Sequence, residues 1–226
     1  MHEPSAFSRP THASPTDAAP ASTATLMGQV LFLVAVAIAF AAAGTFIGRG
    51  LSPGASLGCF FGGFGMLLVS SFGGNRYPIF RVGGFAIGWL YALALLIGLG
   101  MGPAVAYVAT VEPSALTQAA GGTALTVLGM GALGFALSKD LAPWMRPLSI
   151  AILGLVVVSI VMTLFFGGGN PIISLAIYGV SALLIMVDFN FLRKHGTEDH
   201  AVILATGIFV SIVNIFLSLM NLFSGR

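Results

Sequence analysis

The sequence predicts an all-α integral membrane protein built as a seven-transmembrane helix bundle. Of its 226 residues 57% are hydrophobic and only 7% are charged, whereas soluble domains carry about 25% charged residues. The apolar residues form seven runs, each long enough to cross a bilayer. The few charges collect between these runs and act as topology signals. We therefore expect the lipid bilayer as a partner, and no nucleic acid.

The seven runs define the transmembrane domain, residues 26–223. We expect helices over residues 26–47, 54–72, 82–108, 118–137, 145–166, 171–192 and 201–223. Glycine, proline and asparagine, which interrupt helices, separate the runs. The third run is long, and Pro103 near its end is expected to kink or tilt it.

The N-terminal segment, residues 1–25, is rich in Ala, Ser, Thr and Pro and has no apolar periodicity. It is typical of a disordered tail. The run that follows resembles a signal-peptide core, because Ala39-Phe40-Ala41 has the form of a cleavage site. We favour a retained helix, because the run is long enough to span and the tail has a single arginine, Arg9, in place of a basic cluster.

The positive-inside rule predicts the orientation. Seven of the nine Lys and Arg residues fall in the tail and in every second loop, and two, Arg49 and Arg226, fall on the other side. This distribution places the N-terminus in the cytoplasm and the C-terminus outside. An odd number of spans agrees with it, and we expect a multi-pass protein of a bacterial inner membrane.

Polar residues form one stripe on each of the last two predicted helices. In the sixth run Ser174, Tyr178, Ser181 and Asp188 are spaced by four, three and seven, which places them on one helical face. The seventh run has a similar stripe, with spacings of four, three, four and three, formed by Gly207, Ser211, Asn214, Ser218 and Asn221. Because a polar group facing lipid lacks a hydrogen-bond partner, both stripes should face inward. We expect a polar seam with Asp188 near its cytoplasmic mouth.

Asp188 is the only carboxylate inside an apolar run, and two interpretations of it remain open. Removal from water disfavours a charged aspartate, while hydrogen bonds from Ser211, Asn214 or Tyr178 would favour it. Asp188 could then sense protons and attract a cation. Alternatively, it is an orientation anchor that snorkels to the interface or pairs with Arg193.

Other candidate sites have simpler interpretations. His195 and His200 flank Glu198 and Asp199, a pattern that suggests a metal or pH sensor, but we favour a solvated loop because no further ligand is suitably spaced. Lys139 and Asp140 are expected to cap and anchor the fourth span. We expect no metal, no cofactor and no enzymatic activity, because no phosphate loop, serine elbow or second buried aspartate is present.

Glycines recur at intervals of four residues in two of the runs. They form one triplet, Gly54, Gly58 and Gly62, and two pairs, Gly84 with Gly88 and Gly98 with Gly102. Small residues on one face let membrane helices approach closely. Flexible gating is the functional alternative, and we favour packing.

Several short motifs stand at the borders of the runs. They are Gly121-Gly122-Thr123-Ala124-Leu125, Ser138-Lys139-Asp140-Leu141, Leu99-Gly100-Met101-Gly102-Pro103 and the closing stretch from Ala205 to Phe216. In this order the motifs resemble those of the Bax inhibitor-1 family, and the closing stretch is similar to the last helix of its bacterial inner-membrane branch. The resemblance extends over residues 26–223.

The resemblance implies a bundle of Bax inhibitor-1 type and a link to the membrane-anchored protease FtsH. In the family's calcium-leak members two aspartates on the last two helices act as a pH-sensitive latch. Asp188 matches the first of them, whereas Ser211 stands at the second position, and the second span has no buried arginine to accompany them.

Two functions follow as expectations. The first is a regulator of membrane protein quality control and stress that modulates an FtsH-type AAA protease, because such proteases engage flexible ends like residues 1–25. The alternative is a pH-sensitive leak for calcium or another cation, with Asp188 as protonation sensor. Ser211 in place of an aspartate favours the regulator.

Overall fold

The computed structural model describes residues 23–73, 77–80, 82–166 and 170–225 of the chain. Its described part contains seven long helices, each long and apolar enough to cross a membrane, which confirms the predicted fold class. They are α1 (Thr23–Gly48), α2 (Pro53–Gly73), α3 (Gly84–Val111), α4 (Pro113–Ala136), α5 (Ala142–Phe166), α6 (Pro171–His195) and α7 (Ala201–Phe223). Two short 3₁₀ helices, η1 (Pro78–Phe80) and η2 (Glu198–His200), precede α3 and α7.

Three of the described helices begin at a proline, and α4 and α6 are two of them. α4 begins at Pro113, before the expected start at Gln118, because proline lacks the backbone N–H that the first turn leaves unpaired. α6 begins at Pro171 as expected, and the side chain of Asn170 caps it by accepting hydrogen bonds from the backbone N–H groups of Ile172 and Ile173. Pro103 lies inside α3, which continues to Val111.

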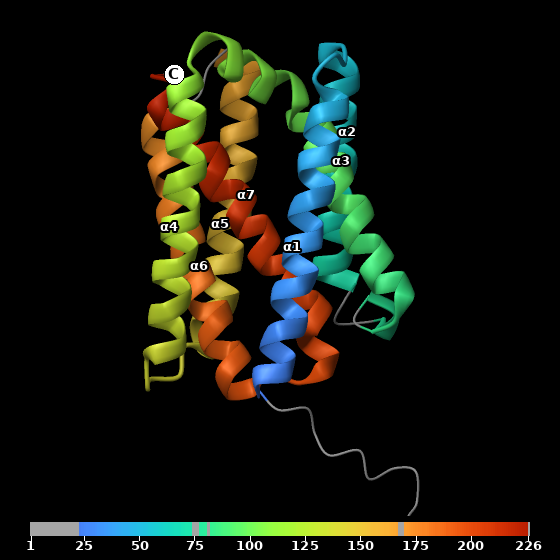
Figure 1. Ribbon diagram of the computed structural model, residues 1–226, viewed down its shortest axis with the longest axis vertical. Coiled ribbons are helices and arrows are strands. Elements are labelled where there is room, and N and C mark those ends of the chain that lie inside the picture. The colour runs from blue at the N-terminus through green and yellow to red at the C-terminus, as the bar shows by residue number, and fades with distance from the viewer. Residues whose placement is uncertain (1–22, 74–76, 81, 167–169, 226) are drawn as a thin grey trace, which may run out of the picture.

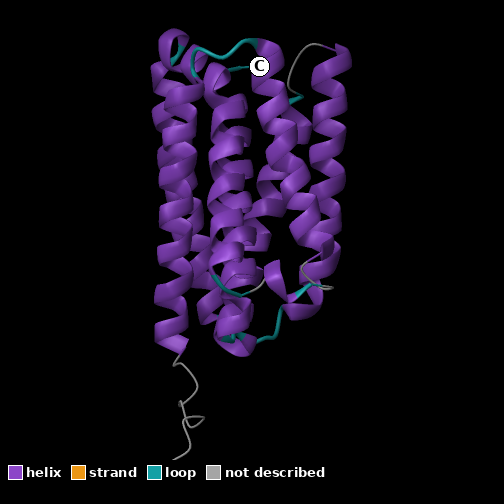
Figure 2. Ribbon diagram, turned by 90° about the vertical axis from the view of Figure 1, so that its right-hand side faces the viewer, coloured by secondary structure: helices purple, strands orange, loops and turns teal. Residues whose placement is uncertain are grey.

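Helix α7 crosses the interior of the bundle and contacts α1, α4 and α6. Figure 1 shows it running obliquely behind α1 and α4, and Figure 2 shows the helices side by side along the long axis. Its Phe209, Ile208 and Ile215 are almost fully buried. α2 and α5 lie at the periphery, α2 against α3 and α5 against α6.

Glycines hold α1 and α3 together. A Cβ on Gly98 would lie 2.2 Å from the carbonyl oxygen of Ala41, and one on Gly102 would lie 2.4 Å from the carbonyl carbon of Gly48. Packing is therefore the role of Gly98 and Gly102, as favoured from the sequence. Gly54, Gly58, Gly84 and Gly88 face open space within the chain, so packing there stays a prediction, and Gly62 meets only the tip of Leu96. Their spacing alone did not show which faces are covered.

The two ends of the bundle differ in charge. The start of α1 and the α4–α5 and α6–α7 connections lie at one end, and the C-terminus lies at the other (Figure 1). Lys139, Arg193 and Lys194 belong to the first end, called the basic end below. Among the described residues Arg49, just after α1, is the single Lys or Arg at the far end. This agrees with the counting rule used above, while the sidedness in a membrane stays a prediction.

Candidate functional site

Asp188 is buried in the interior of the bundle, with 6% of its surface exposed. It lies on the face of α6 that packs against α7, opposite Gly207. A Cβ added to Gly207 would lie 3.4 Å from Oδ2 of Asp188, in ordinary van der Waals contact, so Gly207 lies directly beside the carboxylate. Among the described residues none donates a hydrogen bond to Asp188. The carboxylate instead faces a cavity.

This cavity, which we call the Asp188 cavity, has a volume of about 480 Å³ and lies between α2, α5, α6 and α7. Its walls are mainly apolar. Of the expected site residues, Ser211 and Asn214 line it together with Asp188. Ser71, Arg146 and Ser149 add polar atoms from α2 and α5. The cavity therefore gathers one carboxylate, one guanidinium and several neutral hydrogen-bonding groups inside the predicted membrane span.

Arg146 was missed as a site residue because its position next to a loop made it count only as a topology charge. α5 packs beside α6 and so turns Arg146 into the same cavity as Asp188. The two side chains form no salt bridge in the described structure, where His195 with Asp140 is the ion pair observed. α2 contains no arginine, but a basic group reaches this cavity from α5.

The alternative in which Asp188 is an interfacial anchor does not fit the geometry. Arg193 donates a hydrogen bond to the carbonyl of Leu137 and lies over the Phe135 ring, 5.7 Å from its centroid. Lys194 donates to the carbonyl of Ser138. Both basic side chains thus hold the α4–α5 connection and leave Asp188 buried and unpaired within the described structure.

Tyr178 does not join Asp188, contrary to the expectation from the sequence. Its hydroxyl forms a hydrogen bond of 3.1 Å with the hydroxyl of Thr126 on α4. An α-helix turns by about 100° per residue, so Tyr178 lies about 80° around α6 from Asp188. The predicted stripe therefore divides between two neighbouring helices.

The rest of the predicted seam forms between α6 and α7. At the far end Asn221 donates a hydrogen bond of 2.8 Å to the hydroxyl of Ser174. Ser181, midway between Ser174 and Asp188, is fully buried, and its hydroxyl has no hydrogen-bond partner in the described structure. Within the described structure the seam is thus hydrogen-bonded at its far end, whereas Ser181 and Asp188 have no hydrogen-bond partner.

Asn190 is a buried polar residue that the sequence analysis overlooked. Its Nδ2 donates to the carbonyls of Gly134, Leu137 and Lys139, and its Oδ1 accepts from the backbone N–H of Leu141. Asn190 therefore satisfies the backbone of the α4–α5 connection. A signal was available, because an asparagine two residues beyond Asp188 must face almost the opposite side of the helix.

Asp140 and His195 form an ion pair at the basic end. Oδ2 of Asp140 lies 2.8 Å from Nε2 of His195, and Oδ1 accepts from the backbone N–H of Ala142 at the start of α5. The hydrogen bonds from Ala142 and His195 lower the pKa of Asp140. Asp140 thus caps α5, not the preceding span. His200 pairs with the hydroxyl of Thr197, 2.8 Å away.

The fold and this site define a class: a multi-pass helical membrane protein with a buried carboxylate between its last two helices. A family model described as "Inhibitor of apoptosis-promoting Bax1" matches residues 23–226 of the chain. The protein belongs to this family, the Bax inhibitor-1 family, as its motifs indicated.

Proposed function

We propose that this protein is a proton-controlled cation leak of the membrane, with Asp188 as the group that binds the cation or the proton. The observation that carries the proposal is the buried Asp188 carboxylate facing the cavity that Ser211 and Asn214 also line. An ionisable residue buried at membrane depth is expensive to maintain and is by default a functional one. The proposed role needs no catalytic group.

The charge state of Asp188 decides what the cavity attracts. When ionised, Asp188 supplies a negative charge with neutral oxygens of Ser211 and Asn214 beside it, a donor set suited to a hard cation. When protonated, it loses that attraction. Arg146 faces the same cavity from α5, whereas α2 and α7 contribute only neutral side chains. Arg146 therefore competes with an entering cation for the carboxylate.

An apolar residue of α7 lies between the Asp188 cavity and the second cavity. Val213 of α7 lines the Asp188 cavity on one side and a second cavity on the other. An apolar wall of this kind excludes hydrated ions. Conduction would therefore require α7 to move relative to α6 or α3.

The test is calcium flux into liposomes containing the purified protein, measured between pH 5 and 8. Asp188→Asn should remove the pH dependence of the flux, and Ser211→Asp, which adds a second carboxylate to the cavity, should change its midpoint. Asp199→Asn, a matched change at an exposed aspartate in η2, should leave the profile unchanged. Absence of flux from the wild-type protein would refute the leak.

A second proposal, regulation of an FtsH-type protease in a bacterial inner membrane, depends on the N-terminal tail. Residues 1–22 lie outside the described residues, so its support comes from the composition of the tail alone. Deleting residues 2–22 separates the two functions. A leak should survive the deletion, whereas an effect on degradation of membrane proteins that depends on the tail should disappear.

A further inference from the structure

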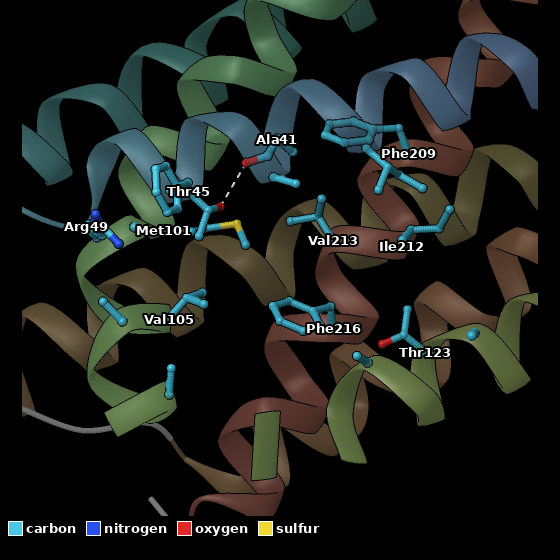
Figure 3. A pocket seen from close by; sticks show the side chains of 18 of the residues that line it. Ala41, Thr45, Arg49, Met101, Val105, Thr123, Phe209, Ile212, Val213 and Phe216 are labelled. Carbon is cyan, nitrogen blue, oxygen red and sulfur yellow. Dashed lines mark hydrogen bonds between the residues drawn. The ribbon is translucent and has the colours of Figure 1, made fainter. Parts of the chain in front are cut away.

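A second and larger cavity lies on the opposite side of α7 from Asp188. Its volume is about 990 Å³, at the upper end of the range for ligand sites, about 300–1,000 Å³. α1 and α3 form one wall, α4 forms the other, and α7 forms the floor (Figure 3). We call it the α1–α4 groove.

The groove offers almost no hydrogen bonds to a ligand. Met101, Val105 and Phe216 are typical of its lining. Two of its few hydroxyl groups are used within their own helices. Thr45 donates to the carbonyl of Ala41 at 2.9 Å, and Thr123 donates to that of Ala119 at 2.7 Å. The body of an occupant must therefore be apolar.

The groove opens sideways, at the depth of the predicted spans. α1 packs mainly against α3 and α7, whereas α4 packs mainly against α6 and α7, so the two rim helices have their main contacts with other helices. Phe46 and Leu128, one on each rim, are 64% and 70% exposed. A molecule in the bilayer can therefore reach the groove without crossing the protein.

A cation lies at the far-end mouth of the groove. Arg49 lines it there (Figure 3). Its guanidinium lies over the Phe46 ring, 4.1 Å from the ring centroid. Arg49 is exposed and makes no salt bridge with any described residue. Glu112, the acidic residue between α3 and α4, does not line the groove. The groove thus pairs a long apolar interior with one uncompensated positive charge at the level of a lipid headgroup.

We propose that the α1–α4 groove binds an anionic phospholipid, with one acyl chain along α7 and the phosphate on Arg49. Arginine suits this role because its guanidinium binds phosphate oxygens in a bidentate manner. The inference does not depend on the proposed leak, because it involves neither Asp188 nor its cavity.

The test is lipid retention by the purified full-length protein, delipidated in detergent and then titrated with phosphatidylglycerol or phosphatidylcholine and measured by native mass spectrometry. Arg49→Ala should lower the apparent affinity for phosphatidylglycerol about fivefold and leave that for phosphatidylcholine unchanged. Arg49→Lys should restore part of the preference. If Arg49→Ala does not alter it, the phosphate contact is refuted.

The apolar part of the site needs its own variant. Ala124→Phe would fill the groove from the α4 rim and should reduce retention of both lipids, whereas Ala132→Phe, at an exposed alanine of α4 outside the groove, should not. Ala42→Phe, from the α1 rim, serves the same purpose if Ala124→Phe does not fold. Undiminished retention in the folded groove variant would overturn the proposal.

Discussion

Replacing Gly98 by alanine tests whether the contact between α1 and α3 stabilises the bundle. The added Cβ would lie 2.2 Å from the carbonyl oxygen of Ala41, whereas ordinary contact begins at 3.4 Å. The two backbones must therefore separate by about 1 Å, because neither atom belongs to a flexible side chain. Overpacking of this kind costs about 1–3 kcal/mol. Alanine also gains about 1 kcal/mol over glycine in a helix.

Gly88→Ala isolates the steric cost. Gly88 lies on the same helix, and a Cβ there meets nothing within 4 Å. Gly88→Ala should therefore raise the free energy of unfolding by the helix-propensity gain alone, about 1 kcal/mol. Subtracting the two variants removes the propensity contribution and leaves the clash. We expect Gly98→Ala to be less stable than Gly88→Ala by about 1–3 kcal/mol, measured by SDS-induced unfolding in mixed micelles with circular dichroism. Equal stabilities would refute the close contact of α1 with α3.

Two further predictions concern the basic end. Asn190→Ala should reduce the free energy of unfolding by about 2–4 kcal/mol, because the hydrogen bonds of its side chain to the last turn of α4 and to the α4–α5 connection are lost. Asn221→Ala, which loses one hydrogen bond to Ser174, should cost about 1 kcal/mol in the same assay. If the two variants lose the same free energy of unfolding, Asn190 does not stabilise the α4–α5 connection as proposed. Because its pKa is lowered in the folded state, Asp140 contributes stability above the ordinary aspartate pKa of about 3.9, and this contribution is lost as the pH falls through the lowered value. The stability difference between wild type and Asp140→Asn should shrink over that acid range, and a constant difference would exclude the effect.

The sequence predicted the seven helices because each must satisfy its own backbone hydrogen bonds in lipid, a requirement that local composition records directly. The sequence also placed Asp188 on an inward face, because the periodicity within one helix is enough to show which of its sides is polar. Tyr178 was assigned to the same face because each spacing along the stripe, taken separately, returns close to the same side of a helix. The angular differences add up over the ten residues from Tyr178 to Asp188, so the hydroxyl of Tyr178 faces Thr126 of α4.

The rest depended on which helices become neighbours. Arg146 enters the Asp188 cavity because α5 lies beside α6, and Gly88 differs from Gly98 because only Gly98 faces α1. Asn190 donates hydrogen bonds to backbone carbonyls, and because every residue has one, the sequence does not show which of them accept. The α1–α4 groove follows from two helices that each pack mainly against other helices, a property that no pattern within either helix encodes.

The two faces of α7 explain how one helix serves both cavities. Gly207, Ser211 and Asn214 line the Asp188 cavity, whereas Phe209, Ile212 and Phe216 line the α1–α4 groove. The stripe residues Gly207, Ser211 and Asn214 therefore face the Asp188 cavity, on a helix whose other side is apolar. Because Val213 borders both cavities, a displacement of α7 toward one enlarges the other. A proton on Asp188 and an acyl chain in the groove would thus act on the same helix from opposite faces.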